Sequence, residues 1–153
     1  MDLIKVGEKA PDFRLVDQDA NHVSLSDFKG KKVLLAWHPL AFTSVCTDQM
    51  RDLENNYDFF EEHNTVALGI SVDAYPAKKV WASSIGLSKL RILSDFNPIG
   101  NMSKAYGEFN EESGASGRAA VLVSEDGEVL WAKQYEPAQR PDIEEIKKIV
   151  SEK

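Results

Sequence analysis

Apolar residues follow two spacings along this chain, one typical of buried strands and one typical of helices. Continuous apolar runs occupy residues 33–37 and 119–123, and residues 65–72 are rich in β-branched and apolar side chains. Each segment has the length of a strand covered on both faces. After the first run and a short loop, apolar side chains recur at offsets of three and four: Met50, Leu53, Tyr57 and Phe60. This second spacing predicts an amphipathic helix that begins near residue 46.

The remaining segments extend an alternation of strands and helices. In chain order we expect an N-terminal hairpin (11–17 and 22–25), a helical turn (26–30), a helix (76–85), a short strand (91–93), a helix ending near 106, a polar surface loop (108–117), a hairpin (119–124 and 129–135) and a final helix starting at 141. On the helix over 76–85, the pattern places Val80, Trp81 and Ile85 on the inner face.

This order of elements predicts an α/β protein. Strands that alternate with helices and then finish as a hairpin plus a helix fit a thioredoxin-like fold, in which helices flank a central mixed sheet. The length of 153 residues is that of one domain, residues 1–153, and the chain contains no repeat, linker or low-complexity segment.

The charge and the apolar content exclude several classes of protein. The net charge is −7 and the 18 lysines and arginines are scattered, which argues against a nucleic-acid surface. No apolar run approaches the roughly 18 residues of a membrane span, and the first residues lack the apolar core of a secretion signal. A single cysteine also fits a reducing compartment. We therefore expect a cytoplasmic protein.

The one cysteine, Cys46, lies where the loop after residues 33–37 meets the next helix. Unpaired backbone N–H groups and the dipole at a helix start favour an anion there, which lowers the pKa of a thiol from its free value of about 8.5. The thiolate is the nucleophilic form, so this position favours a reactive cysteine. Taken without its neighbours, a lone cysteine is more often a small buried apolar residue.

The neighbours of Cys46 favour catalysis. Pro39, Thr43 and Cys46 form the pattern Pro-x-x-x-Thr-x-x-Cys, and Arg118 stands before a later apolar strand. This resembles the active-site signature of the peroxiredoxin family, thiol-dependent peroxidases built on the thioredoxin fold. The likeness spans most of the chain. Within the family, the chain resembles the one-cysteine members, of the alkyl hydroperoxide reductase E or bacterioferritin comigratory protein subfamilies. In that family the hairpin at 11–25 is an addition to the thioredoxin core.

The resemblance assigns a role to each residue of the pattern. Cys46 attacks a peroxide oxygen, Thr43 hydrogen-bonds the peroxide and the thiolate, and Pro39 shields the thiolate from water. Arg118 stabilises the thiolate and the negative charge that builds on the peroxide oxygen. Each position also has a purely structural explanation: Thr43 as a helix cap, Pro39 as a strand terminator, and Arg118 as an exposed residue at a strand end.

Other residues near Cys46 are candidates for the substrate pocket. In the family reading Phe42 and Trp81 form its apolar wall, although both, like Trp37, are also explained as core residues. Gln49 stands three residues after the cysteine, where many family members have a glutamate that helps to position the arginine; glutamine keeps a hydrogen-bonding group without the charge. His38, where relatives often have an aromatic residue, is expected to be a strand-end residue, with proton donation as the alternative.

The resemblance therefore implies a thiol peroxidase that reduces hydrogen peroxide and organic hydroperoxides through a Cys46 sulfenic acid. Since there is no second cysteine, an external thiol must recycle it: thioredoxin, a glutaredoxin or a low-molecular-weight thiol. A homodimer is one state that the resemblance allows. The histidines are not spaced as metal ligands and no cofactor is implied. The alternative function is a non-enzymatic peroxide sensor, or a redox-regulated binding protein, that uses the same cysteine.

Overall fold

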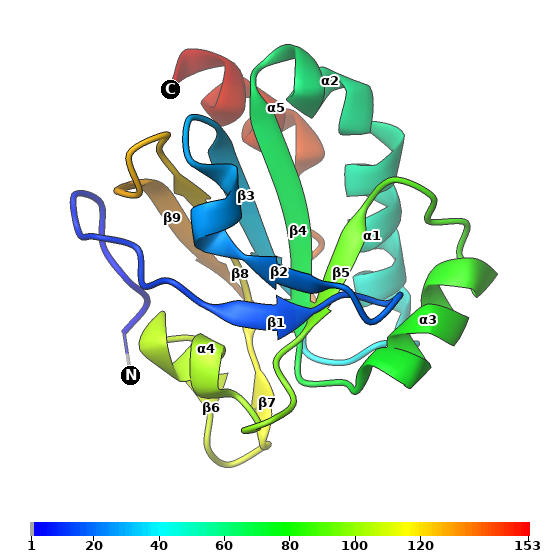
Figure 1. The fold of residues 1–153 in the computed structure, drawn as a ribbon. Helices are drawn as coiled ribbons and strands as arrows, with labels where there is room; N and C mark the ends of the chain where they lie inside the picture. The colour runs from blue at the N-terminus through cyan, green and yellow to red at the C-terminus, as the bar shows by residue number, and fades with distance from the viewer. Residues whose placement is uncertain (1) are drawn as a thin grey trace.

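A seven-stranded mixed sheet, in the order β2-β1-β5-β4-β3-β8-β9, forms the centre of the structure, a computed structural model that describes residues 2–153 (Figure 1). Its strands are β1 (Arg14–Val16), β2 (His22–Ser24), β3 (Lys32–Trp37), β4 (Thr65–Ser71), β5 (Arg91–Ser94), β8 (Arg118–Val123) and β9 (Val129–Tyr135). The helices are α1 (Ser44–Asn55), α2 (Tyr57–Glu62), α3 (Tyr75–Ser84), α4 (Asn101–Ala105), α5 (Ile143–Glu152) and the 3₁₀ turn η1 (Leu25–Phe28).

Strand β3, which lies between β4 and β8, sets the geometry of the site. It is buried along its whole length, pairs parallel with β4 and pairs antiparallel with β8. In this register Trp37, the last residue of β3, lies opposite Ile70 of β4 and Ala119 of β8. The carboxyl ends of two parallel strands and the first residues of β8 therefore meet at one edge of the sheet, which brings residues far apart in sequence together.

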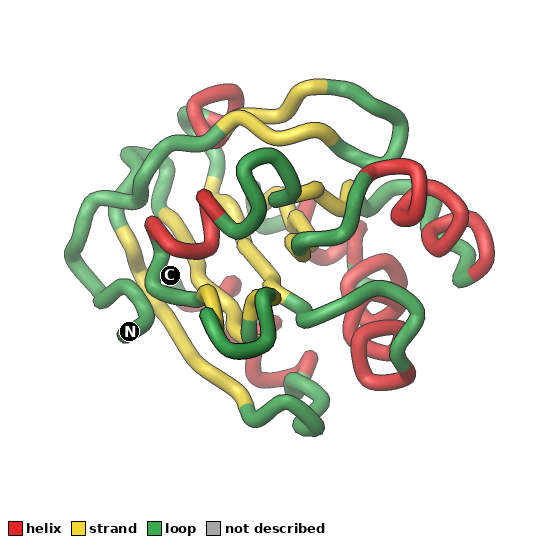
Figure 2. The backbone as a smooth tube through the Cα atoms, turned by 90° about the horizontal axis from the view of Figure 1, so that it is seen from below, coloured by secondary structure: helices red, strands yellow, loops and turns green. Residues whose placement is uncertain are grey.

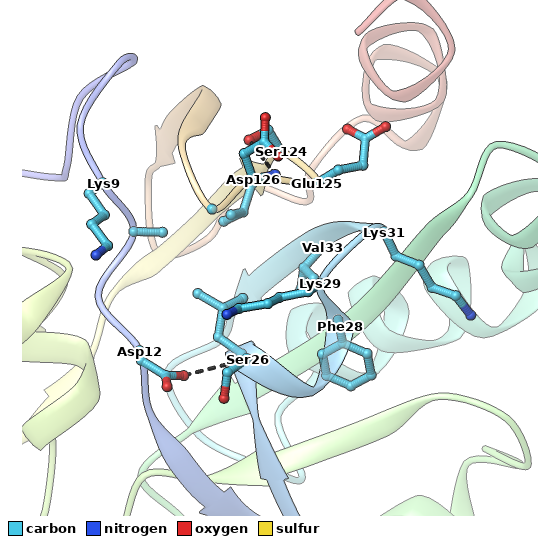
Figure 3. A pocket seen from close by; sticks show the side chains of 14 residues that line it. Lys9, Asp12, Ser26, Phe28, Lys29, Lys31, Val33, Ser124, Glu125 and Asp126 are labelled. Atoms are coloured by element: carbon cyan, nitrogen blue, oxygen red, sulfur yellow. Dashed lines mark hydrogen bonds between the residues drawn. The ribbon is translucent and has the colours of Figure 1, made fainter.

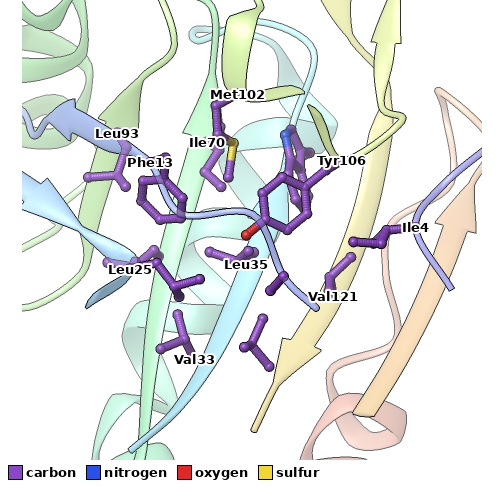
Figure 4. Packing of buried hydrophobic residues seen from close by; sticks show 14 of the residues in the cluster. Ile4, Phe13, Leu25, Val33, Leu35, Ile70, Leu93, Met102, Tyr106 and Val121 are labelled. Carbon is purple, nitrogen blue, oxygen red and sulfur yellow. The ribbon is translucent and has the colours of Figure 1, made fainter. Parts of the chain in front are cut away.

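Each face of the sheet buries its own apolar cluster. One cluster packs under α1, α3 and α5, and includes Cys46 and Trp81. The other lies beneath η1, α4 and the N-terminal segment, where Met102 and Tyr106 pack with Ile70 (Figure 4). Figure 2 shows the same arrangement from below, with helices lying on both faces of the strands. Burial on two faces explains the continuous apolar runs in β3, β4 and β8.

The structure confirms the predicted fold class, a mixed sheet flanked by helices with an N-terminal hairpin, β1–β2. Three details of the prediction are wrong. The helix after Cys46 breaks at Asn56 into α1 and α2. Val80 is 62% exposed, because the inner face of α3 is formed by Lys78, Trp81 and Ala82. The expected surface loop at 108–117 contains a short hairpin, β6 (Phe109–Asn110) with β7 (Ala115–Ser116), and β7 is buried.

Two negative findings apply to residues 2–153. No helix there is both long and apolar enough to cross a membrane. In the same part of the chain, no group of three or more histidine, cysteine, aspartate or glutamate side chains is arranged to hold a metal ion.

Candidate active site

Cys46 lies in the first turn of α1, as the sequence predicted. Its side chain is a free thiol with no exposed surface. Thr43 occupies the N-cap position, but its side chain makes no capping hydrogen bond, and the first turn of the helix contains no acidic residue. The N–H groups and the dipole of this helix start therefore act on the thiol without a competing carboxylate from the same turn.

The loop that carries Pro39 and Thr43 is fixed by its own hydrogen bonds. The N–H of Ala41 donates to the Asp73 carboxylate over 2.8 Å, which ties the loop to the end of β4. Phe42 adopts a left-handed backbone conformation, with φ of 69°. The Thr43 hydroxyl donates to the Leu40 carbonyl over 3.0 Å. Since its proton is used there, the Thr43 oxygen has lone pairs left to accept a hydrogen bond.

Arg118 reaches Cys46 from the first residue of β8. It is 3% exposed, and its Nη2 donates to the Cys46 sulfur over 3.4 Å. Nε and Nη2 also donate to the Pro137 carbonyl, over 3.1 and 2.9 Å. Nη1 donates to Gln49 Oε1 over 2.6 Å. Within residues 2–153 no carboxylate forms an ion pair with this guanidinium, so the thiol is the neighbour best able to take up a compensating negative charge.

Gln49 links this arginine to the end of β3. It is one turn after Cys46 on α1 and 4% exposed. Its Oε1 accepts from Arg118, and its Nε2 donates to the Trp37 carbonyl over 3.2 Å. A glutamine satisfies both partners at once, whereas an ionised carboxylate could only accept. The amide therefore orients the guanidinium without neutralising it.

The aromatic residues of the expected pocket lie on the α3 side. Trp81 is buried, and its Nε1 donates to Thr47 Oγ1 of α1 over 3.2 Å. Phe42 is 59% exposed, and its ring centroid lies 6.3 Å from that of Trp81. The structure thus brings both rings to the turn that carries Cys46, one inside the molecule and one at its surface.

Two buried basic residues near the site, Lys78 and His38, were not predicted as site residues. No sequence pattern indicated that Lys78 is buried, and His38 was expected to be a strand-end residue. His38 follows β3 directly and Lys78 is on the inner face of α3; neither has any exposed surface. Lys78 Nζ lies 3.4 Å from His38 Nε2. Burial lowers the pKa of Lys78 to about 7. Burial, followed by the charges of Lys78 and Arg118, holds the pKa of His38 well below its usual range.

A cavity of about 230 Å³ lies at the other end of β3, next to Val33, the η1 turn and residues 124–127 (Figure 3). Three lysines and three acidic residues stand around its apolar floor: Lys9, Lys29, Lys31, Asp12, Glu125 and Asp126. Its lining includes no cysteine or histidine. The chemistry expected from the sequence is therefore at the opposite edge of the sheet from this cavity.

The sequence is similar to those of other proteins over nearly the whole chain. An alkyl hydroperoxide reductase E from Mycobacterium bovis is 39% identical over 141 residues, which is 92% of this chain and 92% of the relative. A thiol peroxidase from Listeria innocua is 36% identical over 141 residues, which is 92% of this chain and 84% of that protein.

Solved structures show the same fold. The reduced 2-Cys peroxiredoxin of Plasmodium vivax matches with a TM-score of 0.86 and 34% identity, over 95% of this chain and 79% of the other. Mycobacterium tuberculosis AhpC matches with a TM-score of 0.89 over 99% of this chain and 98% of its own, at 20% identity. The sequence model of the AhpC/TSA family matches residues 6–132. The chain therefore belongs to the AhpC/TSA family, the peroxiredoxins.

Proposed function

We propose that this chain is a one-cysteine, thiol-dependent peroxidase that reduces hydrogen peroxide and organic hydroperoxides at Cys46. The observation that carries the proposal is the 3.4 Å contact from Arg118 Nη2 to the Cys46 sulfur at the first turn of α1. The names of the relatives, alkyl hydroperoxide reductase E and thiol peroxidase, support the same activity.

The first step forms a sulfur–oxygen bond. The Cys46 thiolate attacks the terminal peroxide oxygen, the O–O bond breaks, and the other oxygen leaves with the electron pair and takes up a proton as water or an alcohol. Cys46 becomes a sulfenic acid. Negative charge moves from sulfur to the departing oxygen, and Arg118, which already contacts the sulfur, stabilises it at both ends of this path.

The loop residues orient the peroxide. The free lone pairs of Thr43 Oγ1 accept the hydrogen bond of the peroxide O–H, and half-buried Pro39 keeps bulk water from the thiolate. Phe42, whose ring centroid lies 6.3 Å from that of the buried Trp81, offers apolar surface to the organic part of a hydroperoxide. Since Cys46 has no exposed surface, neighbouring side chains must move before the peroxide can reach the sulfur.

The second half of the cycle uses thiols from outside the chain, because Cys46 is the only cysteine. One thiol displaces water from the sulfenic acid and forms a mixed disulfide, and a second thiol releases Cys46 as the free thiol. Thioredoxin, a glutaredoxin or a low-molecular-weight thiol can fill this role. We also propose a homodimer as the functional state, supported by apolar side chains exposed around the loop and α3: Leu40, Phe42 and Val80.

Stopped-flow mixing of the reduced protein with one equivalent of hydrogen peroxide, followed by tryptophan fluorescence and intact mass, tests this function. We expect oxidation orders of magnitude faster than that of a free thiol, with a gain of one oxygen atom at Cys46. Cys46→Ser should abolish the reaction, whereas Ser44→Ala, which removes an exposed hydroxyl from the same turn, should leave it unchanged.

Oxidation no faster than that of free cysteine would overturn the peroxidase. Repeated additions of peroxide and a thiol reductant separate the enzyme from the sensor: an enzyme consumes many equivalents of peroxide, whereas a sensor is oxidised once and stays oxidised.

A further inference from the structure

The mechanism above gives no role to a buried cation that lies near Cys46. Lys78 projects from the inner face of α3 and has no exposed surface, although lysine is among the residues least often buried without a partner. Its single hydrogen-bond partner within residues 2–153 is His38 Nε2, at 3.4 Å. A buried ammonium with one long hydrogen bond is costly for the fold, so its presence calls for a functional explanation.

Two carboxylates lie near Lys78, but other donors occupy both. Asp73, between β4 and α3, accepts from the Ala41 N–H and the Ser71 hydroxyl over 2.8 and 2.6 Å. Asp95, directly after β5, accepts from backbone N–H groups at Met102 and Ser103 and from the Ser103 hydroxyl. Neither carboxylate forms an ion pair with Lys78 in the described part of the chain, so the charge of this lysine is only partly compensated.

His38 faces Lys78 from the end of β3. Burial, followed by the charges of Lys78 and Arg118, lowers its pKa and suppresses its own charge. The neutral ring accepts the Lys78 hydrogen bond through Nε2, which places the ring proton on Nδ1. Nδ1 has no hydrogen-bond partner within residues 2–153. While Lys78 is protonated, the pair thus carries one positive charge, which resides on Lys78.

That charge acts on Cys46 through space. Asp73, Cys46 and Asp95 are the groups whose negative charge favours the protonated form of Lys78. Interaction between two titrating groups is reciprocal, so a protonated Lys78 must favour the Cys46 thiolate to the same extent. Burial preserves this effect, because neither Lys78 nor Cys46 has exposed surface and little water screens the interaction between them.

We propose that Lys78, held by His38, is a positioning residue of the active site that adds to Arg118 a second positive charge, present only while the lysine is protonated. This inference rests on the proposed function of Cys46. Because burial brings the pKa of Lys78 to about 7, the second charge is present in acid and is lost as the pH rises through neutrality. Arg118 supplies a charge that does not change over this range.

The pH profile of peroxide reduction tests the proposal. We would measure the second-order rate constant with hydrogen peroxide from about pH 5.5 to pH 9 for the wild type, Lys78→Met and Lys79→Met. The wild-type profile should contain a decline centred near pH 7. Lys78→Met should lack this decline, react about three- to tenfold more slowly below pH 6.5 and equal the wild type above pH 8.5. Lys79→Met removes the same charge from an exposed neighbour and should follow the wild type throughout.

A second readout does not depend on peroxidase activity. Ultraviolet absorbance of the thiolate gives the pH at which half of Cys46 is ionised, and this midpoint should be higher in Lys78→Met than in the wild type and Lys79→Met. Circular dichroism confirms that the variants are folded, with Lys78→Gln as a second neutral replacement. The proposal would be overturned if Lys78→Met had the same Cys46 midpoint as the wild type and a pH profile of the same shape. A shifted midpoint in a protein that reacts slowly with peroxide would instead overturn the peroxidase function alone.

Discussion

Two buried cations lie near Cys46, and the protein holds them in opposite ways. Arg118 uses Nε, Nη1 and Nη2 to reach two oxygens and the sulfur, at distances from 2.6 to 3.4 Å. Lys78 has one hydrogen-bond partner within residues 2–153, His38 Nε2 at 3.4 Å. Hydrogen bonds to carbonyl and amide oxygens replace the hydrogen bonds that the Arg118 guanidinium made to water. The Lys78 ammonium also loses its hydrogen bonds to water on burial, but it gains only one long hydrogen bond.

The difference shows how a buried positive charge can be permanent, as on Arg118, or conditional on pH, as on Lys78. A guanidinium stays protonated at every accessible pH, and its planar donors fix it beside the sulfur. An ammonium in a dry site gives up its proton when burial is not compensated, which is the reason that the pKa of Lys78 falls to about 7. We therefore expect Arg118 to supply the basal reactivity and Lys78 to modulate it with pH.

Removal of the permanent charge should give the largest effect. Arg118→Met should lower the rate constant for hydrogen peroxide by about 10²–10³-fold, because the contact that follows the charge from sulfur to the departing oxygen is lost. Stopped-flow kinetics at a fixed pH measure this. Arg140→Met is the matched control: Arg140 is half-exposed and pairs with Asp52 over 2.7 Å, so its loss should change the rate less than twofold. Equal losses in both variants would contradict the comparison.

The titration of Lys78 should make the free energy of unfolding depend on pH. The pKa of Lys78 is about 7 in the folded protein and about 10.4 in an unfolded chain. Below pH 7 both states hold the proton and the full cost of burying the ammonium is present. Between these two values the unfolded chain binds more protons, so the free energy of unfolding rises with pH, by up to about 1.4 kcal/mol per unit.

Lys78→Met removes this cost, so it should stabilise the protein by on the order of a few kcal/mol near pH 6, with the gain shrinking toward pH 10. Urea denaturation of the two proteins at several pH values measures the difference. Lys79→Met serves again as the control and should show no pH-dependent gain. A gain that is constant with pH would mean that Lys78 is not the titrating group.

The sequence predicted the features that depend on local pattern. Apolar runs identified β3, β4 and β8, because strands buried on both faces need continuous apolar side chains. The loop and helix spacing placed Cys46 at the start of α1. The contact of Arg118 with Cys46 agrees with the place that the family resemblance gave it, although the role of each residue stays a prediction.

The features that the sequence did not predict depend on contacts between distant segments. Lysine and glutamate are expected at the surface, yet α3 turns Lys78 inward instead of Val80, and Glu108 is 3% exposed within the expected surface loop. Burial raises the pKa of Glu108 to about 7, and Gln134 Nε2 donates to its Oε1 over 2.9 Å. No local pattern signals either residue, since the segments that cover them come from other parts of the chain.

Gln49 provides the finest test of how the permanent charge is held. In Gln49→Leu the guanidinium of Arg118 loses the 2.6 Å bond from Nη1, and the Trp37 carbonyl loses its donor. A less firmly placed guanidinium should lower the rate constant for hydrogen peroxide about tenfold, with the dependence on pH unchanged, because the charge itself remains. Gln49→Glu keeps an acceptor for Nη1 and so still holds the guanidinium, although the Trp37 carbonyl again loses its donor. Its carboxylate competes with the thiolate for the same cation.

The two variants therefore separate position from charge. Gln49→Glu should fall in rate less than Gln49→Leu, and its thiolate should form at a higher pH than in the wild type, as the ultraviolet absorbance of the thiolate would show. If Gln49→Leu reacts at the wild-type rate, the Pro137 carbonyl alone suffices to hold Arg118, through its bonds to Nε and Nη2 of 3.1 and 2.9 Å. The permanent cation would then depend on the backbone of the chain and not on the helix that carries Cys46.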